Sequence, residues 1–237
     1  MSTPVALTQP ELRSLLTVSR EHEYRAYVLF LITTLHGLRV SESIALRRRD
    51  FTVNGDIIFL TVERLKGSEK TTQRLNDCPD SLFNELGVVA EFIKNLKPND
   101  LLFPDTDGSM LTRWQVTTLI QKYGSRAGVP EHKRFAHALK HTCGISMRKA
   151  GCKLEEIQAA LGHKNLNSTA MYLRVSSDES DDARARAFGS EIAKLESEIK
   201  GQLNGGIEKQ ERSELAPLCQ MLSLRRHHNR PIPGGSE

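Results

Sequence analysis

The sequence lacks the features that mark membrane-spanning, secreted and zinc-binding proteins. No run approaches the roughly 20 apolar residues that a membrane span needs, and the richest one, at residues 26–35, is better explained by a buried helix. The N-terminus has neither the basic nor the apolar region of a signal peptide, so we expect a cytoplasmic protein. The four cysteines form no Cys-x-x-Cys pair, and we therefore expect reduced thiols, with neither a zinc site nor a disulfide framework.

Positive charge is only slightly in excess of negative charge. The 237 residues include 33 lysines and arginines and 29 aspartates and glutamates, and the net charge of +4 is compatible with a polyanionic partner without requiring one. Basic residues gather at 47–49, at 132–134 and between 140 and 164, and each cluster alone is best explained as a solvated face. The hydrophobic content of 38% predicts a soluble globular protein. The length of 237 residues is enough for one large domain or two small ones.

The spacing of apolar residues predicts a mainly α protein with a small antiparallel β-sheet, which is an α+β fold. Thr8 and Glu11 match the capping-box pattern that begins a helix. Apolar residues three and four apart predict further helices at 24–35, 40–46, the stretch after Pro79, 112–127, 137–150, 154–161 and 167–174.

A change of period in the first third of the chain predicts the sheet. The turn signal Asn54-Gly55 precedes a β-rich segment at 57–62, which indicates a hairpin that begins near Asp50. A third strand is predicted at 71–75. The sheet is therefore small and inserted among helices.

The last part of the chain differs from what precedes it. Apolar residues recur at spacings of three and four within 181–204, which predicts an amphipathic C-terminal helix. Its apolar stripe suits docking on a neighbouring protomer, and packing against its own domain explains it equally well. Residues 205–237 lose this periodicity, and we expect a mobile tail there.

Three short motifs contain the residue types that phosphodiester exchange without a metal requires. Such chemistry needs cations around the phosphate, an acid for the leaving oxygen and a nucleophile. The motifs are Gly-Leu-Arg-Val-Ser-Glu at 37–42, His-Ala-Leu-Lys-His at 137–141, and Leu-Gly-His at 161–163 with a tyrosine nine residues later. In order and spacing they resemble the Gly-Leu-Arg-x-Ser-Glu, His-x-x-Arg-His and Leu-Gly-His…Tyr motifs of the tyrosine recombinases, the phage integrase family. The resemblance covers roughly residues 7–174.

The resemblance implies a role for each of five side chains. Arg39 would hold two non-bridging phosphate oxygens with its planar fork of donors, while Glu42 would help to hold the local helix. Tyr172 would be the nucleophile, and His137 would accept or relay its proton. His163 would bind or orient the phosphate. Without the resemblance, each has a plainer explanation as a surface ion pair, a capping residue or an amphipathic helix residue.

Lys140 is the clearest departure from the family pattern, because it occupies the place of the second arginine. An ammonium offers a point charge instead of a fork, which predicts weaker orientation of the transition state. His141, next to it, is expected to support the site. Lys66 matches the family's hairpin lysine and would be the general acid to the leaving 5′-oxygen, with Lys70 as an alternative four residues away.

The function that the resemblance implies is site-specific DNA recombination through a 3′-phosphotyrosyl intermediate, without a metal, an organic cofactor or ATP. The implied partner is double-stranded DNA, with a tetramer on paired sites, and a monomer without DNA is compatible with the sequence. Localisation is expected to be cytoplasmic and nucleoid-associated. Residues 1–180 would be the catalytic domain, without the usual N-terminal core-binding domain, as in short members such as fimbrial-switch invertases. Further DNA-binding candidates are Arg47, Arg48, Lys70, Lys133, Arg134 and Lys164.

Two other functions fit the same residues. A DNA-binding regulator that kept the fold but lost catalysis would explain Lys140 and the missing N-terminal clamp. A type IB topoisomerase would use similar chemistry to relax DNA without site dependence. The catalytic interpretations share one spatial requirement, which is that Arg39 and other cations surround one phosphorus atom with the hydroxyl of Tyr172 in line to reach it.

Overall fold

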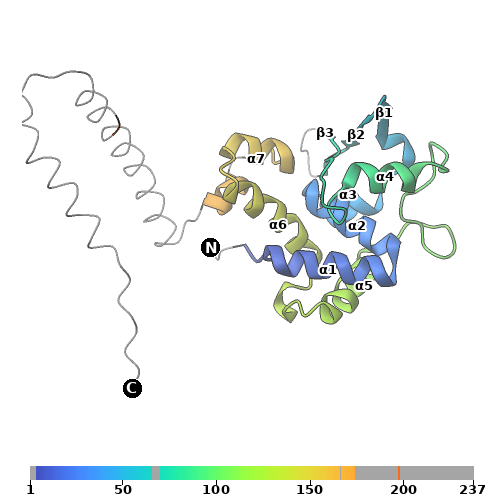
Figure 1. The fold of residues 1–237 in the computed structure, drawn as a ribbon, viewed down its shortest axis with the longest axis horizontal. Coiled ribbons are helices and arrows are strands. Elements are labelled where there is room, and N and C mark those ends of the chain that lie inside the picture. Colours follow the sequence, from blue (N-terminus) through green and yellow to red (C-terminus); the bar gives the residue numbers. More distant parts are fainter. Residues whose placement is uncertain (1–3, 66–69, 166, 174–196, 198–237) are drawn as a thin grey trace, which may run out of the picture. The chain divides into compact units, whose positions relative to one another are not determined.

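Helix α2 (Tyr24–Leu35) is the buried centre of the fold (Figure 1). The computed structural model describes residues 4–65, 70–165, 167–173 and 197. All side chains of α2 from 26 to 34 are buried, which explains why this run is apolar on every face and confirms the prediction of a buried helix. Helix α2 packs against α1 (Gln9–His22), α4 (Glu85–Ile93) and α6 (Ala136–Lys149).

Helix α1 begins at the predicted capping box. The Thr8 side chain accepts the backbone N–H of Glu11, and the Glu11 carboxylate accepts the backbone N–H of Thr8 at 2.7 Å. A cap of this kind stabilises a helix by about 1 kcal/mol. The other helical elements are α3 (Val40–Ile44), η1 (Arg48–Asp50), α5 (Arg113–Arg126), η2 (Glu131–Lys133), α7 (Leu154–Leu161), α8 (Asn167–Ala170) and η3 (Met171–Leu173).

Helix α4 begins later than the sequence suggested. The chain after Pro79 first makes a turn, in which the Asp80 carboxylate accepts the backbone N–H of Leu82 at 3.0 Å. An aspartate that binds the backbone two residues on favours such a turn over a helix. The helix starts only at Glu85, and the side chain of the preceding Asn84 caps it by accepting the N–H of Gly87 at 2.8 Å.

The sheet has three antiparallel strands in the order β1 (Phe51–Asn54), β2 (Ile57–Val62) and β3 (Thr71–Arg74). Asn54 pairs with Ile57, so the hairpin turns on two residues, and the first of them, Gly55, has a φ of +58°. Alternate residues of β2 are buried, which directs one face of the sheet into the core. The predicted α+β fold and its small antiparallel sheet are confirmed.

Two hydrophobic clusters meet at Gly37. The larger contains α1, α2, the sheet, α4 and α5, and the smaller joins α6, α7 and η3 through Cys143, Ile157, Leu161 and Tyr172. Gly37 has a φ of +55°, and a Cβ there would collide with Leu161 and lie 3.3 Å from the Sγ of Cys143. Only glycine fits this position, where the turn after α2 touches the smaller cluster.

Several expectations lie partly or wholly outside the described residues. The structure does not describe the predicted C-terminal helix at 181–204, apart from residue 197. The predicted tail at 205–237, which includes Cys219, also lies outside the described residues. The three cysteines that the structure describes, Cys78, Cys143 and Cys152, are free thiols. Within the described ranges, no helix is long and apolar enough to cross a membrane.

Candidate active site

Arg39 stands at the start of α3 and is held by one carboxylate. Its guanidinium Nη1 donates to Glu42 Oε1 at 2.8 Å, and its backbone N–H donates to Oε2 of the same carboxylate at 2.8 Å. Nη1 also lies 3.4 Å from the carbonyl oxygen of Leu65. The side chain of Arg39 remains 18% exposed, so an incoming anion has access to the guanidinium.

Glu42 is a buried carboxylate that stays charged. Its side chain is fully buried, and burial alone would raise its pKa. Hydrogen bonds from the backbone N–H groups of Arg39 and Leu65 and from the Arg39 side chain, together with the charge of Arg64, outweigh burial and lower the pKa below its ordinary value. Arg64, which sequence analysis missed, lies 3.2 Å from Glu42 Oε2. The supporting role predicted for Glu42 therefore has a geometric basis.

Lys140 joins the first and third motifs. Its Nζ donates to the carbonyl oxygens of Gly37 at 2.6 Å and Leu161 at 3.0 Å, and the residue is only 4% exposed. Burial, followed by the charges of Arg64 and Arg39, lowers the pKa of Lys140 to about 7. The Lys140 side chain therefore lies among backbone carbonyls, and its contact with a phosphate stays a prediction.

The two histidines of the second motif have different surroundings. His137 is exposed on α6, with its ring centroid 6.1 Å from that of His141. The Nδ1 of His141 is 2.9 Å from the hydroxyl oxygen of Tyr172. Burial, followed by the charges of His137 and Lys140, lowers the pKa of His141 to about 4, so its imidazole is neutral at physiological pH. His141 is thus within hydrogen-bonding distance of the hydroxyl of the candidate nucleophile in this structure.

His163 stacks on the candidate nucleophile. Its ring lies 6.4 Å from the ring of Tyr172 with an interplanar angle of 7°, and its Nδ1 is 3.0 Å from the hydroxyl of Thr169. Burial, followed by the charges of Lys140, Arg39 and Arg64, lowers the pKa of His163 to about 4. A neutral imidazole in this position can hydrogen-bond a phosphate without adding charge.

Tyr172 is buried, which differs from the solvent-exposed hydroxyl that a surface helix residue would have. The residue is 2% exposed, and its ring packs so closely on Gly144 of α6 that a Cβ there would lie 2.7 Å from Cζ. Burial, followed by the charge of Cys143, raises the pKa of the phenol. The structure therefore shows the buried hydroxyl of Tyr172 in contact with His141.

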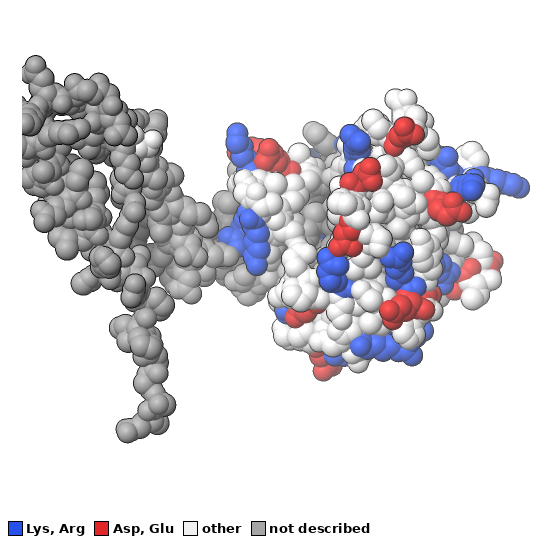
Figure 2. Space-filling view, viewed as in Figure 1, with Lys and Arg blue, Asp and Glu red and all other residues white. Residues whose placement is uncertain are grey.

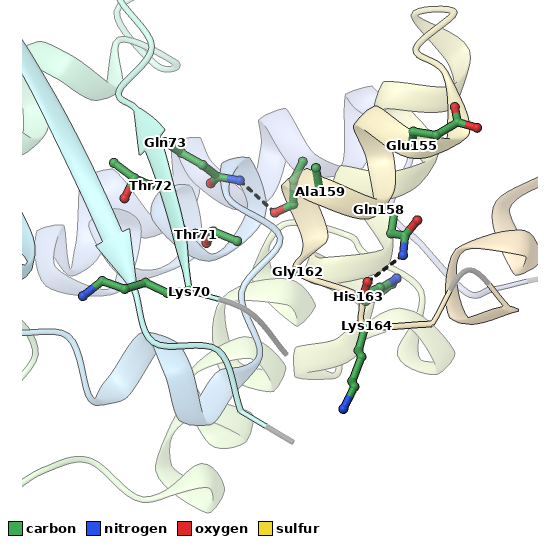
Figure 3. Close-up of a pocket in the computed structure, with 11 residues that line it drawn as sticks. Lys70, Thr71, Thr72, Gln73, Glu155, Gln158, Ala159, Gly162, His163 and Lys164 are labelled. Carbon is green, nitrogen blue, oxygen red and sulfur yellow. Dashed lines mark hydrogen bonds between the residues drawn. The ribbon is translucent and has the colours of Figure 1, made fainter. Parts of the chain in front are cut away.

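A cleft of about 610 Å³ opens between β3 and α7, next to His163. Figure 3 shows Lys70 and Lys164 on its two sides, at the start of β3 and just after α7. Gln73 crosses it and donates to the carbonyl of Ala160 at 2.7 Å. Lys66, the predicted general acid, lies outside the described residues. Its alternative, Lys70, forms an exposed ion pair with Glu63 at 2.8 Å.

Other predicted DNA-binding side chains have partners within the protein. Lys133 binds the Glu11 carboxylate at 2.8 Å, Arg134 donates to the carbonyl of Val129 and Arg48 to that of Phe51. Arg47 donates to the carbonyl of Asn99. Figure 2 shows basic and acidic side chains interspersed on one face of the molecule. DNA contact by these residues stays a prediction. Within the described ranges, no group of three or more His, Cys, Asp or Glu residues is arranged to hold a metal ion.

Comparisons with known proteins agree with the motifs. A model of the phage integrase family matches residues 6–179. The type 1 fimbriae regulatory protein FimB of Escherichia coli K12 is 31% identical over 169 residues, which cover 70% of this chain and 82% of FimB. The tyrosine recombinase XerH of Campylobacter jejuni is 26% identical over 181 residues, which cover 74% of this chain and 50% of XerH.

Solved structures show the same fold. A crystal structure of XerH bound to its difH substrate, described as a pre-cleavage complex, has a TM-score of 0.63 and 25% identity to this chain. The match covers 78% of this chain and 55% of that XerH chain, so this chain spans about half the length of XerH. A crystal structure of XerA recombinase, at 20% identity and a TM-score of 0.64, agrees in fold.

Proposed function

Because this chain belongs to the phage integrase family of tyrosine recombinases, we propose that it is a site-specific recombinase that cuts and rejoins double-stranded DNA through Tyr172. The observation that carries the proposal is the convergence of the three motifs. Lys140 binds the carbonyls of Gly37 and Leu161, and His163 stacks on Tyr172. Residues far apart in sequence thus form one site that contains cations, neutral imidazoles and a phenol.

The proposed reaction exchanges one phosphate ester for another. The phenol oxygen of Tyr172 bonds to phosphorus while the bond from phosphorus to the 5′-oxygen of DNA breaks. The phenol releases its proton and the 5′-oxygen gains one, which leaves a 3′-phosphotyrosyl ester and a free 5′-hydroxyl. A 5′-hydroxyl from a second duplex then reverses these steps, so the exchange needs no ATP. We propose a tetramer on two paired DNA sites for the complete exchange.

Several polar side chains have a proposed part in this reaction. Arg39 holds the non-bridging oxygens, because its guanidinium is partly exposed and firmly positioned by Glu42. His137 accepts or relays the phenol proton, and His141 is the alternative, since its neutral ring lies within hydrogen-bonding distance of the buried phenol. His163 binds the phosphate, and Lys66 protonates the leaving oxygen.

Tyr172 has to leave its buried position before it reacts, because a DNA phosphate has no access to a side chain that is 2% exposed. Gly144→Ala tests this step, since the new methyl group would overlap the Tyr172 ring. We expect an ultraviolet pH titration to show one phenol returning from a raised pKa towards the ordinary value of about 10. The covalent adduct should form faster than in the wild type.

Gly124→Ala on α5 is the matched control, because its methyl group would meet only the flexible side chain of Arg134, at 3.1 Å. It should leave both measurements unchanged. If Gly144→Ala titrates like the wild type, the buried ring does not depend on Gly144 and the proposed displacement is wrong.

A DNA-binding regulator without catalytic activity is the second candidate function. Two observations favour it, the buried hydroxyl of Tyr172 and the engagement of Lys140 by two backbone carbonyls. Incubation with a nicked suicide substrate separates the two candidates, because only an enzyme accumulates a DNA adduct that survives denaturation. Relaxation of supercoiled plasmid without site dependence would instead indicate a topoisomerase.

Replacement of Lys140 by arginine is expected to preserve or raise the rate of adduct formation. A guanidinium restores the fork found at this place in the family and has enough donors for the carbonyls of Gly37 and Leu161. The measurement is the single-turnover rate on the suicide substrate, with thermal unfolding as a control for stability. A rate well below that of the wild type in a folded variant would mean that the local geometry is built for lysine.

A further inference from the structure

Arg64 has a fully buried side chain and links four parts of the site. It follows β2, where Ile58, Leu60 and Val62 alternate towards the interior, and it continues that inward series with a charged group. Its guanidinium partners are Glu42 at 3.2 Å, and the carbonyls of His36 at 3.1 Å, Gly37 at 3.4 Å and Ala160 at 2.8 Å. Its Nε donates to Thr71 at 2.9 Å.

These partners belong to elements that the proposed chemistry brings together. His36 and Gly37 form the turn after α2, Glu42 lies in α3, Thr71 in β3 and Ala160 in α7. A planar group with five donors can satisfy such a set, whereas a lysine has three donors around a single nitrogen. A charge this deeply buried is costly unless it is paired, and Glu42 supplies the pair.

We propose that Arg64 is a positioning residue of the active site, which fixes Arg39 through Glu42 and shares the Gly37 carbonyl with Lys140. This inference rests on the proposed function. Arg64 has no solvent-exposed side-chain surface, so its effect on DNA passes through the two residues that it positions.

The link to Arg39 passes through both carboxylate oxygens of Glu42. Oε1 accepts from the Arg39 guanidinium and from the backbone N–H of Leu65, while Oε2 accepts from Arg64 and from the backbone N–H of Arg39. Loss of Arg64 removes one of these four bonds and leaves the carboxylate less tightly oriented. The Arg39 fork, which depends on that carboxylate, would then be held less precisely for the phosphate.

The link to Lys140 is electrostatic. Nη1 of Arg64 and Nζ of Lys140 both donate to the carbonyl oxygen of Gly37, at 3.4 Å and 2.6 Å. After burial, the charge of Arg64 is the largest cause of the lowered pKa of Lys140, ahead of Arg39, while Glu42 and Cys143 act in the opposite direction. Among the residues that the structure describes, the other titratable groups that face Lys140 are His141 and His163, and the charge of Lys140 lowers the pKa of both.

The charge of Lys140 determines in which direction the activity changes with pH. With a pKa of about 7, Lys140 is an ammonium below neutral pH and becomes neutral above it. The share of activity that depends on its charge is therefore lost as the pH rises through about 7. Without the charge of Arg64 the ammonium becomes more stable, and the loss moves to higher pH by roughly one pH unit or more.

The test compares Arg64→Gln, Arg64→Lys and the control Gln73→Met. Gln73 donates to the same Ala160 carbonyl as Arg64 and contacts Nδ1 of His36, but it is uncharged, so its replacement disturbs these contacts without removing a charge from the surroundings of Lys140. Two quantities are measured in each protein. One is the rate of adduct formation at saturating DNA as a function of pH. The rate at each pH is divided by the rate of Lys140→Arg at the same pH, so that the effects of other titrating groups cancel. The other is the pKa of Lys140 from NMR titration of its Cε resonance.

Arg64→Gln is expected to slow adduct formation by roughly 10- to 100-fold at saturating DNA, as loss of an outer-shell partner does elsewhere. Its DNA affinity should change little, and its Lys140 should titrate at higher pH than in the wild type. Arg64→Lys keeps the charge but loses the fork, so it should slow the reaction while Lys140 titrates as in the wild type. Arg64→Lys also tests the positioning role of Arg64 if Arg64→Gln does not fold.

Two results would overturn the inference. One is an unchanged Lys140 pKa in Arg64→Gln, and the other is an equal loss of rate in Gln73→Met, which would reduce Arg64 to a packing residue. If the wild type forms no adduct at all, the proposed function fails instead, and the NMR titration still decides whether Arg64 controls Lys140.

Discussion

Tyr172→Phe is expected to form no covalent adduct with DNA, which is the largest effect of any single substitution in the site. The phenol oxygen is the proposed nucleophile, and loss of a nucleophile in another covalent enzyme lowers the rate on the order of 10⁶-fold. The fold should persist, because the phenylalanine ring still fills the space against Gly144. Only the hydrogen bond to His141 is lost, at a cost of about 1 kcal/mol.

The control for this substitution is Tyr24→Phe. Tyr24 is 42% exposed at the start of α2, away from the smaller hydrophobic cluster that contains Tyr172. It should form the adduct at the wild-type rate. Both proteins are compared on the nicked suicide substrate by denaturing electrophoresis, with DNA affinity measured in parallel at one salt concentration. An adduct in Tyr172→Phe equal to that of the control would assign the nucleophile to another residue.

Arg39→Gln is expected to reduce the rate of adduct formation by about 10²- to 10³-fold, as removal of a preorganised donor to a developing charge does in other enzymes. The substitution should affect the stability of the fold less than it affects this rate. Glu42 keeps its ion pair with Arg64 at 3.2 Å and its bonds from two backbone N–H groups, so its buried charge is not left without partners.

Arg39→Lys separates charge from geometry at this position, and Arg49→Gln serves as the control. Arg39→Lys restores the charge without the fork and should stay well below the wild type. Arg49→Gln removes an exposed arginine whose guanidinium contacts Asn99 at 2.8 Å, and it should leave the single-turnover rate unchanged. If Arg39→Gln cleaves as fast as Arg49→Gln, the phosphate is held elsewhere and Arg39 serves only to position Glu42.

Sequence periodicity predicted the elements of the fold because most of their signals are local. The capping box of Thr8, the apolar run of α2 and the Asn54-Gly55 turn each act within a few residues, and each is confirmed. The start of α4 was missed because the turn at Asp80 competes with the apolar spacing around it. The motifs also single out Arg39, Glu42 and His163. The structure pairs Arg39 with Glu42 and places His163 within the influence of the Arg39 charge, while their catalytic roles stay predictions.

Long-range contacts explain what the sequence did not reveal. The partners of Lys140 lie 103 and 21 residues away, and those of Arg64 span α2 to α7. Nothing local in the Met-Tyr-Leu segment signals that Tyr172 is buried against Gly144 or bonded to His141. One signal was available, since Arg64 continues the inward alternation of β2 and an arginine at an inward position calls for a buried partner.

The most direct test of the account is to identify the residue joined to DNA. The adduct from the nicked suicide substrate is digested with trypsin and nuclease, and the modified peptide is sequenced by mass spectrometry. We expect a nucleotide on the peptide of residues 165–174, attached through the phenol oxygen of Tyr172. A nucleotide on any other residue, or sequence-specific DNA binding by wild-type and Gly144→Ala proteins without an adduct in either, would contradict the account.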